Sequence, residues 1–439
     1  MSTVTVLRQP AVDYLDTLLT DQPQLPASPL AQVNALRAEA VEYLDGLAMP
    51  TLRDEEWRFT DLSPLTRLPF EPVRSATVLQ ASDIAPFYLD DAPTRLVFID
   101  GIYAPQLSSQ ATAGGVVVVT SLPAIGAGHA AAIQAQLGRH QVISDNVFAA
   151  LNTAFLHDAA VIVVPRNVAL EAPVHVLFIA TQASVVSYPR CLLVAEAGSS
   201  ATLIEDYVAL QDGPYLINPV TEIALADQAH VKHVRVQRDS QQAFHIANCA
   251  VSAGRASHYQ SVSIAMGAQI SRYNLSVLLA EGAECAVDGL ALIADSQLAD
   301  THTRIDHAKP HGMSRQLHKC IAGGSAHAVF NGKVMVRPGA QRTDSMQSSR
   351  NLLLSAKAHV DTKPQLEIFA DDVKCAHGAT VGQLDIEEVF YLKSRGLSDG
   401  AARSLLTYAF AGEIIERIPV ASLKHRLAQR VLAQTGSPP

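Results

Sequence analysis

Short runs of β-branched and aliphatic residues fill the middle of the chain. Between about residues 95 and 382 they include RLVFIDG, GVVVVTS, AAVIVVP and VHVLFIA, and AHVKHVRVQRD alternates apolar with polar positions. Such runs and such alternation are typical of β-strands. Helical periodicity nearly disappears from this stretch, so the centre of the chain is predicted to consist of strands.

A glycine-containing turn recurs between these runs, in AEAGSSA, SAGRAS, AMGAQI, AEGAEC and RPGAQR. Gly254, Gly267 and Gly282 are 13 and 15 residues apart, too close for a strand and a helix but enough for a strand and a corner. This spacing favours a β-solenoid, in which each rung buries its apolar side chains against the next. An antiparallel sandwich is the alternative, because turn spacing does not distinguish stacking from hairpin pairing.

Helical patterns occupy both ends of the chain. In SPLAQVNALRAEAVEYLDGL, Ser28 is the expected N-cap of a helix. After Gly382, Asp385 and Ser398 are expected to cap two further helices, and a third follows Pro419. The middle one has a broad apolar face that needs a covering surface, made of Ala402, Leu405, Leu406, Ala409 and Ile414.

These patterns predict a mainly β protein with three parts. A helical N-terminal domain is expected over residues 1–90, a solenoid core over 91–382 and a helical C-terminal domain over 383–439. The only tryptophan, Trp57, lies in the connector MPTLRDEEWRFTDLSPL and is interpreted as a packing anchor.

Composition narrows the classes of function. The chain has 439 residues, of which 48% are hydrophobic and 17% charged, so it can bury a large core. A net charge of -9 argues against the nucleic-acid backbone as the main partner. Neither a secretory signal pattern nor a membrane-length apolar run is present, and we expect a cytoplasmic protein without a membrane partner.

The cysteines are few and scattered, and none forms a C-x-x-C pair. This fits a reducing compartment and excludes a self-contained zinc-ribbon or ferredoxin-like ligand set. Any metal would need mixed ligands or ligands from another chain. The five cysteines are Cys191, Cys249, Cys285, Cys320 and Cys375.

One cysteine stands beside a histidine in LEIFADDVKCAHGATVG. Residues i and i+2 of a strand share a face, which puts Cys375 and His377 roughly 6.5 to 7 Å apart along the strand. A thiolate and an imidazole so placed can each supply one ligand to iron or a cluster and leave positions for another chain. The alternative is a buried cysteine beside a hydrogen-bonded histidine, with Asp371 and Asp372 capping the turn.

Other candidate chemistry is weaker. His302, His307, His311, His318 and His327 follow no fixed metal-binding spacing, and a polar solenoid edge explains them as well. Neither a Walker A loop nor a G-x-S-x-G elbow occurs. The sequence names no catalytic nucleophile, and we expect a protein that is not an enzyme.

Longer segments resemble a known family. QLHKCIAGGSAHAVFNGKVMV, VDTKPQLEIFADDVKCAHGATVGQLDIEEVFYLKSRGL, TRIDHAKPHGMSRQLHK and MPTLRDEEWRFTDL resemble the SufB/SufD family of iron-sulfur cluster assembly proteins, most closely its SufD members. The resemblance implies a right-handed parallel β-helix between α-helical terminal domains. It also implies a scaffold that builds and transfers nascent clusters without catalysing ATP hydrolysis itself.

The resemblance also implies partners and a site. A SufB-like paralogue would pair with the β-helix as a heterodimer, a SufC-type ABC ATPase would dock on the C-terminal helices, and the isolated chain could form a homodimer. A transient cluster or iron would be held at the paralogue interface by His377, the histidine of the K-C-x-H-G-A-T segment, with Cys375 as a second participant. No tightly bound cofactor is expected in the isolated chain.

Two other functions stay open at this point. One is a β-helical carbohydrate-active enzyme, although such enzymes are usually secreted and rich in aromatic platforms, whereas only 5% of this chain is aromatic. The other is a SufB-like scaffold that holds a cluster unaided. The cluster type, its sulfur donor and acceptors, and any flavin are not specified by these residues.

Overall fold

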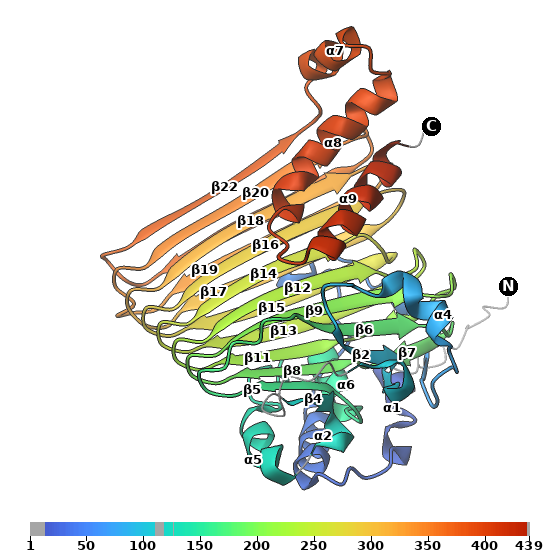
Figure 1. Ribbon diagram of the computed structural model, residues 1–439, viewed down its shortest axis with the longest axis vertical. Coiled ribbons are helices and arrows are strands. Elements are labelled where there is room, and N and C mark those ends of the chain that lie inside the picture. Colours follow the sequence, from blue (N-terminus) through green and yellow to red (C-terminus); the bar gives the residue numbers. More distant parts are fainter. Residues whose placement is uncertain (1–13, 110–117, 126, 437–439) are drawn as a thin grey trace, which may run out of the picture.

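A computed structural model describes residues 14–109, 118–125 and 127–436 and shows a β-solenoid of about eight turns with helices at its ends (Figure 1). Strands make up 40% of the chain and helices 23%. The strands of successive turns pair in parallel. The predicted fold class is therefore confirmed, and the alternative of an antiparallel sandwich is wrong.

The solenoid has two sheets, and the chain passes from one to the other at each corner. Sheet A runs in the order β21 (His359–Ile368), β19 (His327–Val336), β17 (Leu298–His307), β15 (Ile270–Leu279), β13 (Phe244–Ala253), β11 (Val220–Leu225), β8 (Arg190–Ala195), β5 (Ala160–Val164) and β4 (Val118–Ser121), with β1 (Glu71–Pro72), β7 (Val185–Ser187) and β10 (Leu216–Ile217) beside it. Sheet B runs in the order β22 (Lys374–Gly382), β20 (Asp344–Leu353), β18 (Met313–Ala322), β16 (Glu284–Ile293), β14 (His258–Ala265), β12 (His230–Arg238), β9 (Ser200–Ala209), β6 (Val174–Ala180), β2 (Thr94–Ile99) and β3 (Ile102–Tyr103).

Side chains stack in columns because neighbouring strands are in register. Phe98 pairs with Phe178, and Phe178 pairs with Tyr207. The ring centroids of these two pairs lie 5.3 and 4.8 Å apart, close to the spacing between strands. This aromatic column fills the lower interior of the solenoid, where offset rings add to the stabilisation from burial.

The recurring glycines serve the corners in two ways. Gly282 and Gly339 adopt φ values of 64° and 85°, which glycine takes without a steric penalty. Gly267 is needed for space instead, because a Cβ there would lie 2.4 Å from the carbonyl oxygen of Asp239. The turn motif thus marks real corners.

Helices cover the two ends of the chain differently. The base of the solenoid is covered by α2 (Ala31–Leu44) and α6 (Val147–Ala154). Four further helices also belong to this end: α1 (Tyr14–Leu19), α3 (Ser63–Thr66), α4 (Ala81–Ile84) and α5 (Ala127–Gln136). Helices α5 and α6 lie between β4 and β5, so they interrupt the region that was expected to contain only strands. The boundaries of the three expected domains stay predictions.

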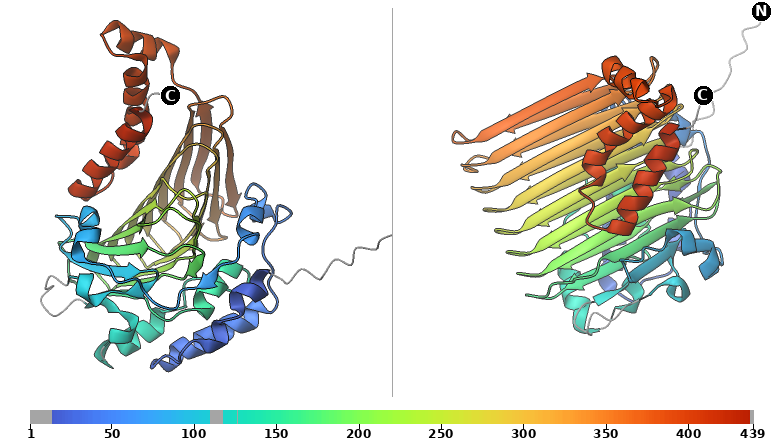
Figure 2. Two further views of the ribbon diagram at one scale, coloured as in Figure 1. Left: turned by 90° about the vertical axis from the view of Figure 1, so that its right-hand side faces the viewer. Right: turned by 45° about the horizontal axis from the view of Figure 1, so that its top comes forward.

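The C-terminal helices are α7 (Ile386–Ser394), α8 (Asp399–Ile415) and α9 (Ala421–Gly436). Helix α9 and the second half of α8 lie across the outer face of sheet B (Figure 2). Asp385 and Ser398 accept hydrogen bonds from the first-turn backbone of α7 and α8, which confirms both expected caps. Ser28 is not the N-cap of α2, because that helix begins after Leu30. No described helix has the length and apolar character needed to span a membrane.

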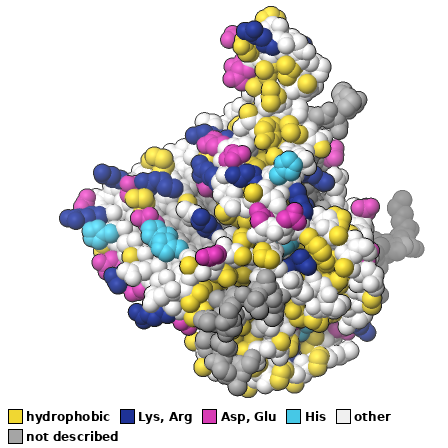
Figure 3. All heavy atoms as spheres, viewed as in Figure 1, with side chains coloured by type: hydrophobic (Ala, Val, Ile, Leu, Met, Phe, Trp, Pro, Cys, Tyr) yellow, Lys and Arg dark blue, Asp and Glu magenta, His cyan; other side chains and the backbone are white. Residues whose placement is uncertain are grey.

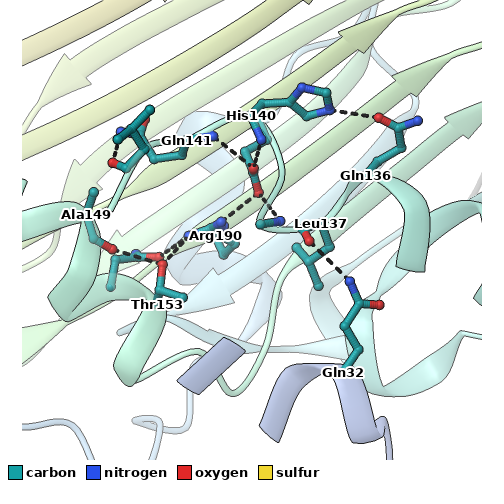
Figure 4. A network of polar contacts seen from close by, with 12 residues as sticks. Gln32, Gln136, Leu137, His140, Gln141, Ala149, Thr153 and Arg190 are labelled. Atoms are coloured by element: carbon teal, nitrogen blue, oxygen red, sulfur yellow. Dashed lines mark hydrogen bonds and ion pairs between the residues drawn. The ribbon is translucent and has the colours of Figure 1, made fainter. Parts of the chain in front are cut away.

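A buried ion pair between two strands holds the segment that follows α5 against the base of the solenoid (Figure 4). Arg190 on β8 donates to the Glu222 carboxylate on β11 over 2.6 Å, and both side chains are fully buried. Glu222 also accepts backbone hydrogen bonds from Gly138, His140 and Gln141, which follow α5. The charge of Arg190 holds the pKa of Glu222 below its usual range although burial opposes this.

The connector before the solenoid is fixed by Trp57. Its ring lies 5.6 Å from that of Phe148 and 4.2 Å from the guanidinium of Arg272. Arg272 in turn forms a 2.5 Å ion pair with Asp300, which also accepts from Thr60. These contacts agree with the interpretation of Trp57 as a packing anchor.

Replacing Glu222 by Gln should lower the free energy of unfolding by about 3–5 kcal/mol, because Arg190 would keep a buried charge without a partner. Urea unfolding followed by circular dichroism measures the change. The matched control is Glu39→Gln on the exposed face of α2, which should shift stability by about 0.5 kcal/mol at most. Equal unfolding curves for the two variants would contradict this role for the ion pair.

Candidate functional site

Strand β22 ends sheet B and carries both residues proposed from the sequence. It pairs with β20 on one side, and among the described residues no strand pairs with its other side. Nearly all of its residues are exposed. An edge of this kind presents free backbone donors and acceptors, which makes it a template for another chain.

Cys375 and His377 continue two interior columns of the solenoid. Cys375 pairs with Ser345 and His377 with Gln347, and both of these β20 residues are buried. The two candidates therefore share the face of β22 that adjoins the interior. The predicted juxtaposition is present, with a thiol and an imidazole side by side at the open end.

The two side chains differ in exposure. His377 is exposed, whereas Cys375 is half-buried and packs beside a small apolar cluster that includes Val334 and Ala370. Burial raises the pKa of the Cys375 thiol, and the neighbouring Asp344 carboxylate acts in the same direction. In this chain alone, Cys375 is a protonated thiol at neutral pH rather than a ready thiolate ligand.

A hydrogen-bonded chain lies beneath Cys375. Ser345 accepts from Ser314 over 2.8 Å, and the Ser314 hydroxyl lies 2.9 Å from His307 Nε2. Burial lowers the pKa of His307 to about 4, so its ring is neutral. In the neighbouring column Gln347 donates to Gln316 over 2.8 Å. The interior below the candidate site is thus polar, in contrast to the aromatic column near the base.

The other histidines considered from the sequence do not form one site. His302 is held between the carboxylates of Asp300 and Glu56, and its pKa is raised by Asp300 against the effect of burial. His318 is buried with its ring stacked 4.5 Å from Phe330. His307 bonds within the interior as described, and His311 occupies an exposed turn with a φ of 64°.

Sequence reasoning considered His327 but missed two residues that its ring contacts. These are His359 and Asp361. In AHVDTKP, His359 and Asp361 are separated by one residue, and this i, i+2 spacing places both on one face of a strand. That spacing was the signal available in the sequence. Asp371 and Asp372 lie in an exposed bend between β21 and β22, as the turn interpretation expects.

An apolar groove of about 530 Å³ lies between α7 and α8. Helix α7 buries only Val389, and the tip formed by α7 and the start of α8 projects beyond the strands (Figure 1). Figure 3 shows hydrophobic side chains gathered on this tip. The groove lining contains Leu405, Leu406 and Ala409, three members of the apolar face expected for α8, together with Tyr391 and Leu392 of α7. The lining is completed by three acidic residues at the start of α7, namely Asp385, Glu387 and Glu388.

Family comparisons agree with this architecture. Residues 178–410 match the model of the SufBD core domain of SUF system FeS cluster assembly, and residues 9–176 match that of the SufBD protein N-terminal region. The chain belongs to the SufBD family. Its match to SufD of Escherichia coli is 34% identical and covers 88% of this chain and 89% of that protein.

Two further relatives extend the comparison of this SufBD-family chain. An iron-sulfur cluster assembly SufBD family protein of Synechocystis is 42% identical over 91% of this chain and 90% of its own length. SufD of Bacillus subtilis is 26% identical over 90% of this chain and 92% of its own length. The SufD-like character expected from the sequence is confirmed.

Among the five cysteines, Cys375 should be the one that reacts with an alkylating reagent in the folded protein, because the others are buried. Its rate should keep rising as the pH passes the ordinary thiol pKa, since the raised pKa leaves little thiolate at lower pH. Mass spectrometry of peptides after timed alkylation measures this. Cys375→Ser should remove the fast-reacting position, and rapid labelling of buried Cys320 would contradict the structure.

Proposed function

We propose that this SufBD-family chain is a SufD-like scaffold subunit that supplies one edge of a shared iron-sulfur cluster assembly site. The observation that carries the proposal is the open strand β22, which presents Cys375 and His377 where the solenoid ends. The cluster is cargo here, built at the site and passed on. In this role the chain binds and positions its cargo and is not itself an enzyme.

The incomplete ligand set on β22 favours a cluster site that is completed by a second polypeptide. A cluster needs more than one sulfur and one nitrogen ligand, and among the described residues no other cysteine approaches β22, because the remaining four are buried lower in the solenoid. A SufB-like paralogue that pairs at this end would cover the edge and add the missing ligands. A half-site also suits transfer, since separating the two chains removes ligands.

The groove between α7 and α8 is the proposed docking surface for a SufC-type ABC ATPase. Outside the groove lining, α7 exposes further apolar side chains on the same tip, among them Phe390 at 72% and Ile386 at 80% exposure. The chain has no Walker A loop of its own, so a partner would supply ATP hydrolysis. A contiguous patch of exposed apolar side chains of this kind is typical of an interaction site.

Helix α8 connects that groove mechanically to the strands beside the candidate site. Glu413 on α8 forms ion pairs with Lys319 on β18 over 2.5 Å and with Arg350 on β20 over 3.3 Å. Strand β20 is the direct neighbour of β22. Motion of docked ATPases during ATP binding would therefore pull on the strand beside the site and open or close the shared interface.

The alternative of a carbohydrate-active enzyme loses its support once the chain is placed in the SufBD family. A scaffold that holds a cluster unaided remains the competing function. Anaerobic reconstitution of the isolated chain with iron and sulfide separates the two. The proposal expects no stable cluster in the isolated chain, in keeping with its incomplete ligand set, and retention of one would overturn it.

His377→Ala should reduce cluster formation in the complex with the paralogue and ATPase by roughly tenfold or more, while the complex itself still assembles. Cys375→Ala should have a smaller effect, since its half-buried thiol is the less available ligand. Co-purification reports assembly, and absorbance during anaerobic reconstitution reports the cluster. His425→Ala on the exposed side of α9 is the control. Loss of the complex in His377→Ala would assign that residue to structure.

Phe390→Asp should abolish ATPase docking, because it places a charge in the exposed apolar surface of α7 beside the groove. The matched control is Val78→Asp, since Val78 is 82% exposed near the base of the solenoid. Co-purification of the ATPase with each variant measures docking, and circular dichroism confirms folding. Normal ATPase recovery with Phe390→Asp would place the docking surface elsewhere.

A further inference from the structure

Three potential metal ligands converge on the outer face of sheet A. The imidazole rings of His327 and His359 stack with centroids 3.9 Å apart, and His327 Nε2 lies 2.8 Å from an Asp361 carboxylate oxygen. One ligand atom from each residue lies within 4.8 Å of the other two. His327 and Asp361 are half-buried, and His359 is exposed.

Strand geometry explains the convergence. His327 and His359 pair directly in the parallel ladder of β19 and β21, so their side chains leave the sheet one strand spacing apart. Asp361 follows His359 by two residues and shares its face. The intervening residue Val360 packs toward the apolar cluster that contains Ala326 and Ala328, which fixes the three polar side chains on the outside.

We propose that His327, His359 and Asp361 bind one divalent first-row transition metal ion, with Zn²⁺ as the reference ion. Two imidazole nitrogens and one carboxylate oxygen form a donor set that such ions favour. Binding through His327 Nε2 needs the neutral tautomer that carries its hydrogen on Nδ1, so the hydrogen now shared with the Asp361 carboxylate moves to Nδ1 by exchange with solvent when the ion takes its place. Water fills the remaining coordination position.

The distances need only small side-chain movements. Ligand bonds to Zn²⁺ are about 2.0–2.2 Å long, so two ligand atoms of one tetrahedral ion lie about 3.3–3.5 Å apart. The imidazole to carboxylate distance of 2.8 Å and the 4.8 Å limit on the whole group bracket that value. The rings are already tilted by 21°, so a modest rotation aims both at one ion.

Sheet B contains a matched pair that lacks this convergence. His230 and His258 also stack, with centroids 4.5 Å apart and planes only 5° from parallel. Their nearest carboxylate, Glu284, comes from a third strand and approaches His258 at 3.2 Å. Among the described residues, only the group on sheet A brings three donors within reach of one ion.

The proposed ion is separate from cluster assembly. His359 begins β21 in sheet A, while Cys375 and His377 lie on β22 in sheet B. The site uses residues of this chain alone. It can therefore be tested in the isolated chain, with neither the paralogue nor the ATPase present.

The test is calorimetric titration of the full, chelator-treated chain with Zn²⁺, repeated with Co²⁺ so that visible absorption reports the ligand type. One equivalent should bind. His327→Ala, His359→Ala and Asp361→Asn should each weaken binding by roughly tenfold or more. The control His230→Ala and the variant His377→Ala should bind as the parent does.

Two results would overturn the proposal. One is unchanged Zn²⁺ affinity in His359→Ala, whose exposed position makes it the variant least liable to disturb folding. The other is loss of the single equivalent in His230→Ala or His377→Ala. Circular dichroism of each variant shows that it is folded, and for any variant that is not, His359→Gln serves as the second measurement with the same expected loss.

Discussion

Parallel, in-register pairing of successive rungs is the constraint on which this structure depends. Each strand satisfies its backbone hydrogen bonds only through the rung before and the rung after it, so the ladder must end somewhere. At the base, the antiparallel strands β3 and β4 close the two sheets, and the Glu222 network binds helical segments across them. At the other end β21 and β22 have no such cover among the described residues. The base is therefore closed by this chain's own residues, whereas the end formed by β21 and β22 is open to a partner.

The same constraint explains how much of the fold could be predicted. Apolar runs and glycine corners are local, and they indicated short strands, tight turns and a repeat. The caps Asp385 and Ser398 are local as well, and both were predicted correctly. Helices α5 and α6 were missed for different reasons: the alanine-rich sequence of α5 gives no apolar stripe, whereas α6 is short and buries all eight of its residues, so no solvent-facing side marks it. Turn spacing favoured a solenoid but left an antiparallel sandwich open, and the parallel pairing was expected from the family resemblance.

The candidate site was less accessible to sequence reasoning. Spacing alone put Cys375 and His377 on one face, but an interior cysteine beside an ordinary histidine fits that spacing equally well, and only the family resemblance favoured a cluster role. The proposed ligands His359 and Asp361 form a site only together with His327, which lies one full turn away in the solenoid. Turn length is irregular, as the column of Phe244, Ile270, Leu298, His327 and His359 shows, so register cannot be counted along the chain.

Interior polarity also changes along the solenoid, and this bears on movement at the candidate site. The lower turns are filled by stacked rings such as Phe178 and Tyr207, whose burial and close packing resist rearrangement. The upper turns contain Ser314, Ser345 and Gln347, which gain little from apolar burial and depend on hydrogen bonds that can be exchanged. The end for which we propose that cargo is accepted and released is therefore the end with the weaker apolar core. Its position is fixed instead from outside, by the ion pairs of Glu413 with β18 and β20, so a force applied to α8 acts where the interior resists it least.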